Sequence, residues 1–142
     1  FNLHGHVQNM ESAEALGWEL DHARDQLSPA LREKLEWALA EPRGKLAEGR
    51  AAFAAAQAAF SEAIAGYDAV LTPSAPGEAP LGTEYTGDPA FNSLWTMLHT
   101  PCATIPAGVG PKGLPLGAQI VTRRGEDAAA LMWAEWLRLA IG

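Results

Sequence analysis

Cysteine is nearly absent from the sequence, since Cys102 is the only one among 142 residues. A single thiol excludes an internal disulfide and a zinc site built from cysteines. We expect Cys102 to pack as a small core residue rather than to act as a nucleophile. The composition favours a reducing, cytoplasmic location. No apolar run reaches the roughly 18 residues that a membrane-spanning helix needs, which predicts no membrane partner.

Basic residues are also scarce. The chain has 10 lysines and arginines against 17 aspartates and glutamates, a formal net charge of −7. An acidic chain without a basic cluster is poorly suited to bind phosphates or anionic lipids, so we predict no nucleic-acid partner. His4 and His6, in the opening HGH, could bind a metal as neighbours on a strand. A frayed terminus is the favoured interpretation, and we predict no metal site.

Residues 1–66 have the pattern of a helical segment. Apolar residues at helical spacing predict a helix over about 7–26, which Gly17 weakens. Ser28 followed by Pro29 is typical of a helix start, because the hydroxyl can cap the helix and proline fits its first turn. A further helix is expected over 42–65, ending at Gly66 in the left-handed conformation.

Residues 67–142 predict the order strand, loop, helix, strand, strand, helix. These elements are expected at 67–72, 73–89, 90–100, 102–107, 116–122 and 126–141. The loop is rich in proline and glycine, and its length indicates a functional or mobile segment. The last helix is apolar almost all round, so it needs cover on most sides. We therefore expect the chain to form a homo-oligomer.

The stretch GVGPKGLPLGAQIV, at 108–121, contains the spacing G-x-G-x-x-G. This spacing can hold a dinucleotide pyrophosphate where a helix follows the third glycine. Here Pro115 and Gly117 oppose a helix, and the β-prone residues after them favour a strand. We interpret the stretch as a strand–turn–strand connection and predict no nucleotide cofactor.

Three stretches taken together resemble a known family. In order from residue 67 onward they are YDAVLTPSAPGEAP, TGDPAFNSLWTMLHTPCATIPAG and GLPLGAQIVTRRGEDAAALMWAEW. They resemble the C-terminal part of an amidase-signature enzyme, similar to an amidase or to the A subunit of glutamyl-tRNA amidotransferase. The resemblance implies an α/β fold: mixed-sheet strands flanked by helices, here with a helical first half.

The resemblance also implies an activity. Amidase-signature enzymes hydrolyse carboxamide C–N bonds, or pass on the released ammonia, through a Ser–cis-Ser–Lys triad. A small-molecule amide would be the substrate, and no cofactor is implied. None of the five serines or three lysines here lies in the family's Gly/Ser-rich or lysine motif.

We therefore expect no catalytic residue in this chain and no activity from it alone. The start at Phe1 instead of Met agrees with this expectation. Segments 1–66 and 67–142 would together form one incomplete domain of a longer enzyme. The alternative is a noncatalytic folding or interaction module related to the same family.

The loop after the first strand and the segment that follows it help to line the substrate pocket in the family. The residues that the resemblance places there are Thr72, Asp88, Asn92, Trp95 and Thr96. Asp88 has a second interpretation as the cap of the helix at 90–100. His99 stands where most members of the family have glycine, which affects the local packing.

Overall fold

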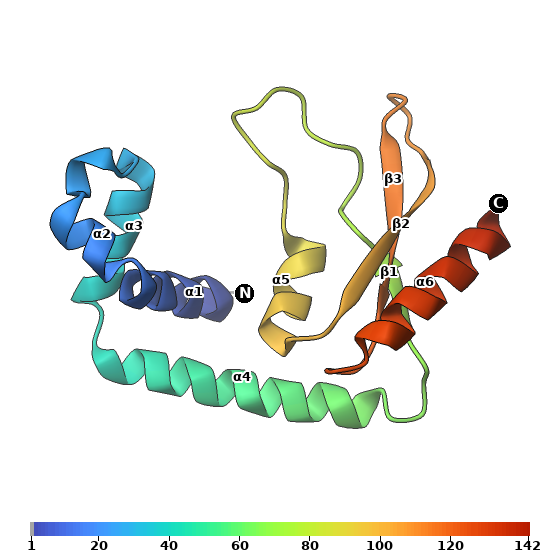
Figure 1. Ribbon diagram of the computed structural model, residues 1–142, viewed down its shortest axis with the longest axis horizontal. Helices are drawn as coiled ribbons and strands as arrows, with labels where there is room; N and C mark the ends of the chain where they lie inside the picture. Colours follow the sequence, from blue (N-terminus) through green and yellow to red (C-terminus); the bar gives the residue numbers. More distant parts are fainter. Residues whose placement is uncertain (1) are drawn as a thin grey trace. The chain divides into compact units, whose positions relative to one another are not determined.

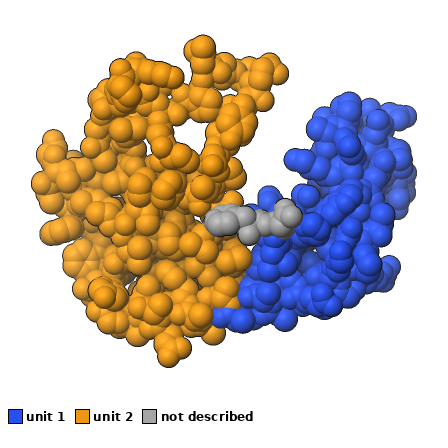
Figure 2. Space-filling model, turned by 180° about the vertical axis from the view of Figure 1, so that it is seen from behind, with its two compact units in different colours: residues 1–55 blue, residues 56–142 orange. Residues whose placement is uncertain are grey.

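Helices make up the amino-terminal part of the chain. The computed structural model describes residues 2–142 (Figure 1). These residues divide after Ala55 into two compact units (Figure 2). The helical elements are α1 (Asn2–Ala15), α2 (Gly17–His22), the 3-10 turn η1 (Arg24–Gln26), α3 (Pro29–Ala40) and α4 (Arg43–Ala63). Helix α4 supplies residues to both units.

The prediction of one continuous helix over 7–26 is wrong. Helix α1 begins well before Val7, the chain turns at Leu16, and α2 ends at His22. The interruption lies beside Gly17, whose flexible backbone makes it the weakest helix former in this stretch. The prediction located the weak point but not the break.

The histidines of HGH lie inside α1, and the frayed terminus expected for them is wrong. His4 stacks on Phe53 with ring centroids 6.2 Å apart, and His6 packs edge-on against Trp37 at 4.8 Å. Among residues 2–142, no group of three or more His, Cys, Asp or Glu side chains is arranged to hold a metal ion.

Packing of α1 and α3 forms the core of the first unit. The helix start predicted at Ser28 is confirmed, because its hydroxyl accepts a hydrogen bond from the Leu31 amide at 3.3 Å. Across the helices, the Arg50 guanidinium donates to the carboxylates of Glu11 and Glu14 at 2.9 and 3.1 Å. The buried residues are Val7, Met10, Ala13, Leu20, Leu35, Ala38 and Leu46.

The second unit is built on a three-stranded sheet. Its strands are β1 (Val70–Pro73), β2 (Cys102–Val109) and β3 (Pro115–Val121), in the order β1-β3-β2, with both pairs antiparallel. Gln119 of the central strand lies opposite Thr72 on one side and Thr104 on the other. Paired residues in an antiparallel sheet point to the same face.

Helices cover both faces of this sheet, as Figure 1 shows for α5 (Ala90–Leu98) and α6 (Asp127–Ile141). On one face, Trp95 and Leu98 of α5 pack on Val121, together with Phe60 from the end of α4. The buried residues of the other face are Ile105, Ile120, Ala134 and Leu137. The predicted α/β class is thus confirmed as helices on both faces of a sheet.

The glycine-rich stretch forms a hairpin turn between β2 and β3, as predicted, although β2 continues to Val109 and the turn begins only at Gly110. Its backbone bonds run from the Gly110 amide to the Leu114 carbonyl at 2.8 Å, and from the Gly113 amide to the Gly110 carbonyl at 3.0 Å. Gly113 has φ 84°, which favours glycine. A strand follows the third glycine, so the turn has no helix N-terminus to hold a pyrophosphate.

Two local predictions are wrong. The φ of Gly66 lies outside the left-handed region, because the chain leaves α4 through a tight turn in which the Tyr67 amide donates to the Ile64 carbonyl at 3.0 Å. Cys102 is exposed rather than in the core, since it begins an edge strand. Partial burial still raises the pKa of the Cys102 thiol, which disfavours a nucleophilic role.

His99 ends α5 in the left-handed conformation, with φ 54° and ψ 39°. Among residues 2–142 it is the one non-glycine residue with positive φ. We predict that His99→Gly raises the free energy of unfolding by about 1 kcal/mol, because a β-carbon is unfavourable in this conformation. Urea denaturation measures the change. His99→Ala loses the imidazole but keeps the β-carbon, so a gain of similar size in that variant contradicts the explanation.

Candidate substrate pocket

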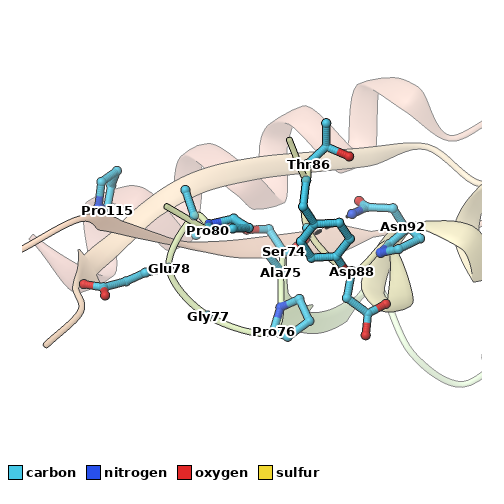
Figure 3. Close-up of a pocket in the computed structure, with 15 residues that line it drawn as sticks. Ser74, Ala75, Pro76, Gly77, Glu78, Pro80, Thr86, Asp88, Asn92 and Pro115 are labelled. Carbon is cyan, nitrogen blue, oxygen red and sulfur yellow. Dashed lines mark hydrogen bonds between the residues drawn. The ribbon is translucent and has the colours of Figure 1, made fainter. Parts of the chain in front are cut away.

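A cavity of about 510 Å³ opens in the second unit beside the carboxyl end of β1 (Figure 3). Its walls come from the irregular loop after β1, the start of α5 and the start of β3. The lining residues are Ser74, Ala75, Pro76, Gly77, Glu78, Ala79, Pro80, Tyr85, Thr86, Gly87, Asp88, Pro89, Asn92, Pro115 and Gly117. Seven of these fifteen residues are proline or glycine, so backbone contributes much of the wall.

Hydrogen bonds fix the base of this loop to the sheet and to α5. The Ser74 amide donates to the Gly117 carbonyl at 3.0 Å, which extends the β1–β3 pairing by one residue. The Asn92 side-chain amide then donates to the Ser74 carbonyl at 3.3 Å. Asn92 therefore ties the first turn of α5 to the loop while lining the cavity.

The far end of the loop is shaped by Asp88. Its carboxylate accepts a hydrogen bond from the Ala90 amide at 2.9 Å and so caps the start of α5, although Pro89 is the boundary residue of that helix. Asp88 also lines the cavity. The two interpretations of this residue, helix cap and pocket group, are therefore compatible.

The charged side chains of the lining are all acidic. Its charged side chains are the carboxylates of Glu78 and Asp88, and its polar uncharged groups include Asn92 and Tyr85. A cavity with carboxylates and without a basic side chain in its lining favours uncharged polar or cationic ligands over anions. A carboxamide fits this requirement, since it is uncharged and offers both hydrogen-bond donors and an acceptor.

The lining lacks the lysine that a Ser–Lys catalytic pair requires. Its side-chain hydroxyls belong to Ser74, Tyr85 and Thr86, and no lysine or histidine is among the lining residues. Ser12 and Ser28, in the first unit, use their hydroxyls in hydrogen bonds to helix backbone. The cavity has the chemistry to bind and orient a small molecule, but not that of a Ser–Lys catalytic pair.

Known proteins resemble this chain in structure and in sequence. The crystal structure of an amidase superimposes with a TM-score of 0.85 over 99% of this chain, at 28% identity, and the match covers 35% of the amidase chain. Among curated sequences, the A subunit of glutamyl-tRNA(Gln) amidotransferase from Cereibacter sphaeroides is 37% identical over 86 residues, and that from Rickettsia bellii is 35% identical over 84.

The chain is similar to a solved amidase and to amidotransferase A subunits. No protein-family model matches it. A bacterial aryl acylamidase of the amidase-signature family shares the fold at a TM-score of 0.61 and 19% identity, over 88% of this chain and 29% of its own. The alignments cover about a sixth of the two curated sequences, 18% and 17%, and 55% and 54% of this chain. The resemblance and the α/β fold that it implied are confirmed.

The five residues that the amidase resemblance assigns to the pocket fall into two groups. Asp88 and Asn92 line the cavity. Thr96 lies one turn further along α5, and its hydroxyl donates to the Asn92 carbonyl at 3.1 Å. Thr72 and Trp95 lie between α5 and the sheet, outside the lining. The substrate-binding roles of all five stay predictions.

Sequence reasoning missed Glu78 and Tyr85, which both belong to the cavity lining. Both lie in the proline-rich loop, where no periodic pattern indicates which side chains point inward. A signal was available for Glu78. It is the acidic residue within PSAPGEAP, and a carboxylate in a turn-rich loop is well placed to accept hydrogen bonds from backbone amides.

The hydroxyl of Thr72 and the indole nitrogen of Trp95 are buried without a hydrogen-bond partner among the described residues. We predict that Thr72→Val raises the free energy of unfolding by about 1 kcal/mol, because an unpaired buried hydroxyl is unfavourable and valine has the same shape. Urea denaturation measures it. Thr104→Val, on the exposed edge strand, is the control. Destabilisation by Thr72→Val contradicts the prediction.

Proposed function

We propose that this chain forms the amide-binding part of an amidase-type hydrolase that cleaves carboxamide C–N bonds. The observation that carries the proposal is the similarity to a solved amidase over 99% of this chain, at 28% identity. The three ordered amidase-like stretches support it, as does the pocket beside them, whose lining favours uncharged polar or cationic ligands over anions.

The catalytic step is assigned to residues outside this sequence. The lining of the pocket lacks a lysine, and none of the serines lies in a Gly/Ser-rich motif. In the proposed enzyme, Asn92 and the loop backbone would hold the amide, while a serine and a lysine from elsewhere would attack it and relay the proton. A cytoplasmic location, as the composition favours, is part of the same proposal.

Titration of the isotope-labelled chain with benzamide, followed by NMR, tests the binding role. We expect chemical-shift changes at lining residues such as Asp88 and Asn92, and a weaker response in Asn92→Ala. Benzoate is the matched control ligand, because it has the same shape but carries a negative charge that Glu78 and Asp88 disfavour. Equal responses to both ligands, or none to benzamide, contradict the proposal.

An assay of ammonia release from benzamide tests the assignment of catalysis. The 142-residue chain by itself should release none above a buffer blank. Turnover by the chain alone contradicts the assignment to residues outside it. Absence of both binding and turnover favours the noncatalytic module.

We also propose that the chain associates through α6. Its exposed apolar side chains include Met132, Trp136 and Leu139, which lie on one stripe at helical spacing. Sedimentation velocity should detect a dimer or larger species, and Leu139→Glu should shift it toward monomer. Ala140→Glu adds the same charge beside the stripe and should have a smaller effect. A parent chain that stays monomeric at high concentration contradicts this proposal.

A further inference from the structure

The proline-rich loop of the pocket needs an anchor between its two ends. Its first residue, Ser74, is hydrogen-bonded to Gly117. Asp88, near the last residue of the loop, is hydrogen-bonded to Ala90. Between them the chain forms no helix or strand. The hydrogen bonds that attach the interior of the loop to another described element both end on one atom, Oε1 of Glu78.

Glu78 reaches the turn of the β2–β3 hairpin. Its Oε1 accepts hydrogen bonds from the Lys112 amide at 2.8 Å and from the Leu114 amide at 3.1 Å. Figure 3 places Glu78 with Pro115 at one end of the cavity, away from Asp88 and Asn92. Because a carboxylate accepts stronger hydrogen bonds than a neutral oxygen, this contact is well suited to hold a loop without secondary structure.

The glycine spacing of the turn makes room for this side chain. A β-carbon placed on Gly110 would lie 2.5 Å from both Cγ and Cδ of Glu78, closer than such atoms can approach. The φ of Gly110 is not in the left-handed region, so glycine is needed here for space and not for conformation. The middle glycine of G-x-G-x-x-G thus accommodates an acidic side chain from the same chain.

We propose that Glu78 is a positioning residue of the pocket: its carboxylate fills an anion site in the glycine-rich turn and thereby fixes the proline-rich wall. The inference about ligand affinity rests on the proposed function, because an amide is taken as the ligand. The anchoring itself does not. Without Glu78, the wall at 75–87 is held only at its ends, and the cavity loses one of its fixed sides.

Amide hydrogen exchange of the 142-residue chain tests the anchor. Glu78→Ala should raise the exchange rates of the Lys112 and Leu114 amides by about tenfold or more, while those of the β3 core, Ile120 and Val121, stay slow and report an intact fold. Glu78→Gln keeps an acceptor oxygen and should retain part of the protection. Glu84→Ala removes a carboxylate from the same loop and should leave both amides unchanged.

Gly110→Ala provides a second route to the same state, since it displaces Glu78 without removing its carboxylate. It should raise exchange at Lys112 and Leu114 as Glu78→Ala does. If both amides exchange in Glu78→Ala and Gly110→Ala as in the parent chain, the anchor does not exist and the inference is overturned.

Benzamide titration of the same variants tests the consequence for binding. Glu78→Ala should raise the dissociation constant several-fold, with Glu78→Gln closer to the parent and Glu84→Ala equal to it. Equal affinity in parent and Glu78→Ala overturns the positioning role. If the parent chain does not bind benzamide but exchange rises as expected, the proposed function fails and the anchor is supported.

Discussion

Trp95→Ala should lower the free energy of unfolding of the second unit by about 3–5 kcal/mol. Trp95 is 8% exposed and packs with Leu98 and Val121 between α5 and the sheet, with its ring 5.7 Å from that of Phe60. Truncation leaves a large cavity that a close-packed layer cannot fill. Urea denaturation followed by circular dichroism measures the loss.

Two variants separate the packing of Trp95 from a binding role. Trp18→Ala is the same substitution at a site that is 65% exposed and should cost at most about 1 kcal/mol. Trp95→Phe keeps an aromatic ring and removes the unpartnered indole N–H, so it should lose far less stability than Trp95→Ala. If Trp95→Ala folds as well as the parent but no longer binds benzamide, Trp95 is a binding residue and not a core residue.

Gly117→Ala should destabilise the second unit by about 1–3 kcal/mol. A β-carbon at this position would meet the Ser74 hydroxyl and would lie 2.9 Å from Cγ2 of Thr104. Glycine is therefore needed where β1, β2 and β3 approach one another beside the pocket. Thermal unfolding and urea denaturation measure the loss, and the hydrogen bond from Ser74 to Gly117 makes the pocket loop the first segment to respond.

The partner residue supplies the control for this prediction. Thr104→Ser removes the methyl group that a β-carbon at Gly117 would strike, so Gly117→Ala combined with Thr104→Ser should recover part of the lost stability. Gly66→Ala is the matched neutral substitution, because a β-carbon there meets nothing within 4 Å. Equal effects at Gly66 and Gly117 contradict the steric explanation.

Local signals in the sequence predicted most elements of the fold. Ser28 capped its helix as expected, and the run of β-prone residues after Pro115 became the central strand. These features depend on neighbours a few residues away. The order β1-β3-β2 and the cover by α5 on one face and α6 on the other depend on distant packing, which periodicity alone does not specify.

The pocket was predictable only in part. Asp88 and Asn92 lie beside a recognisable helix start, and both line the cavity. Trp95 is in the family-aligned segment, but helical geometry turns its side chain toward the sheet, where burial decides its role. Glu78 acts through amides that lie 34 and 36 residues away, and no pattern within the proline-rich loop indicates such a partner.

The strand order has a consequence for how the second unit folds. Strands β2 and β3 are joined by a short turn and form a local hairpin, whereas residues 74–114 separate β1 from β3. Closing a long loop is entropically costlier than closing a short one, so β1 should join a hairpin that has already formed. The pocket lies beside the β1–β3 pairing, which forms late. It should therefore be the last part of this unit to assemble and the first to open.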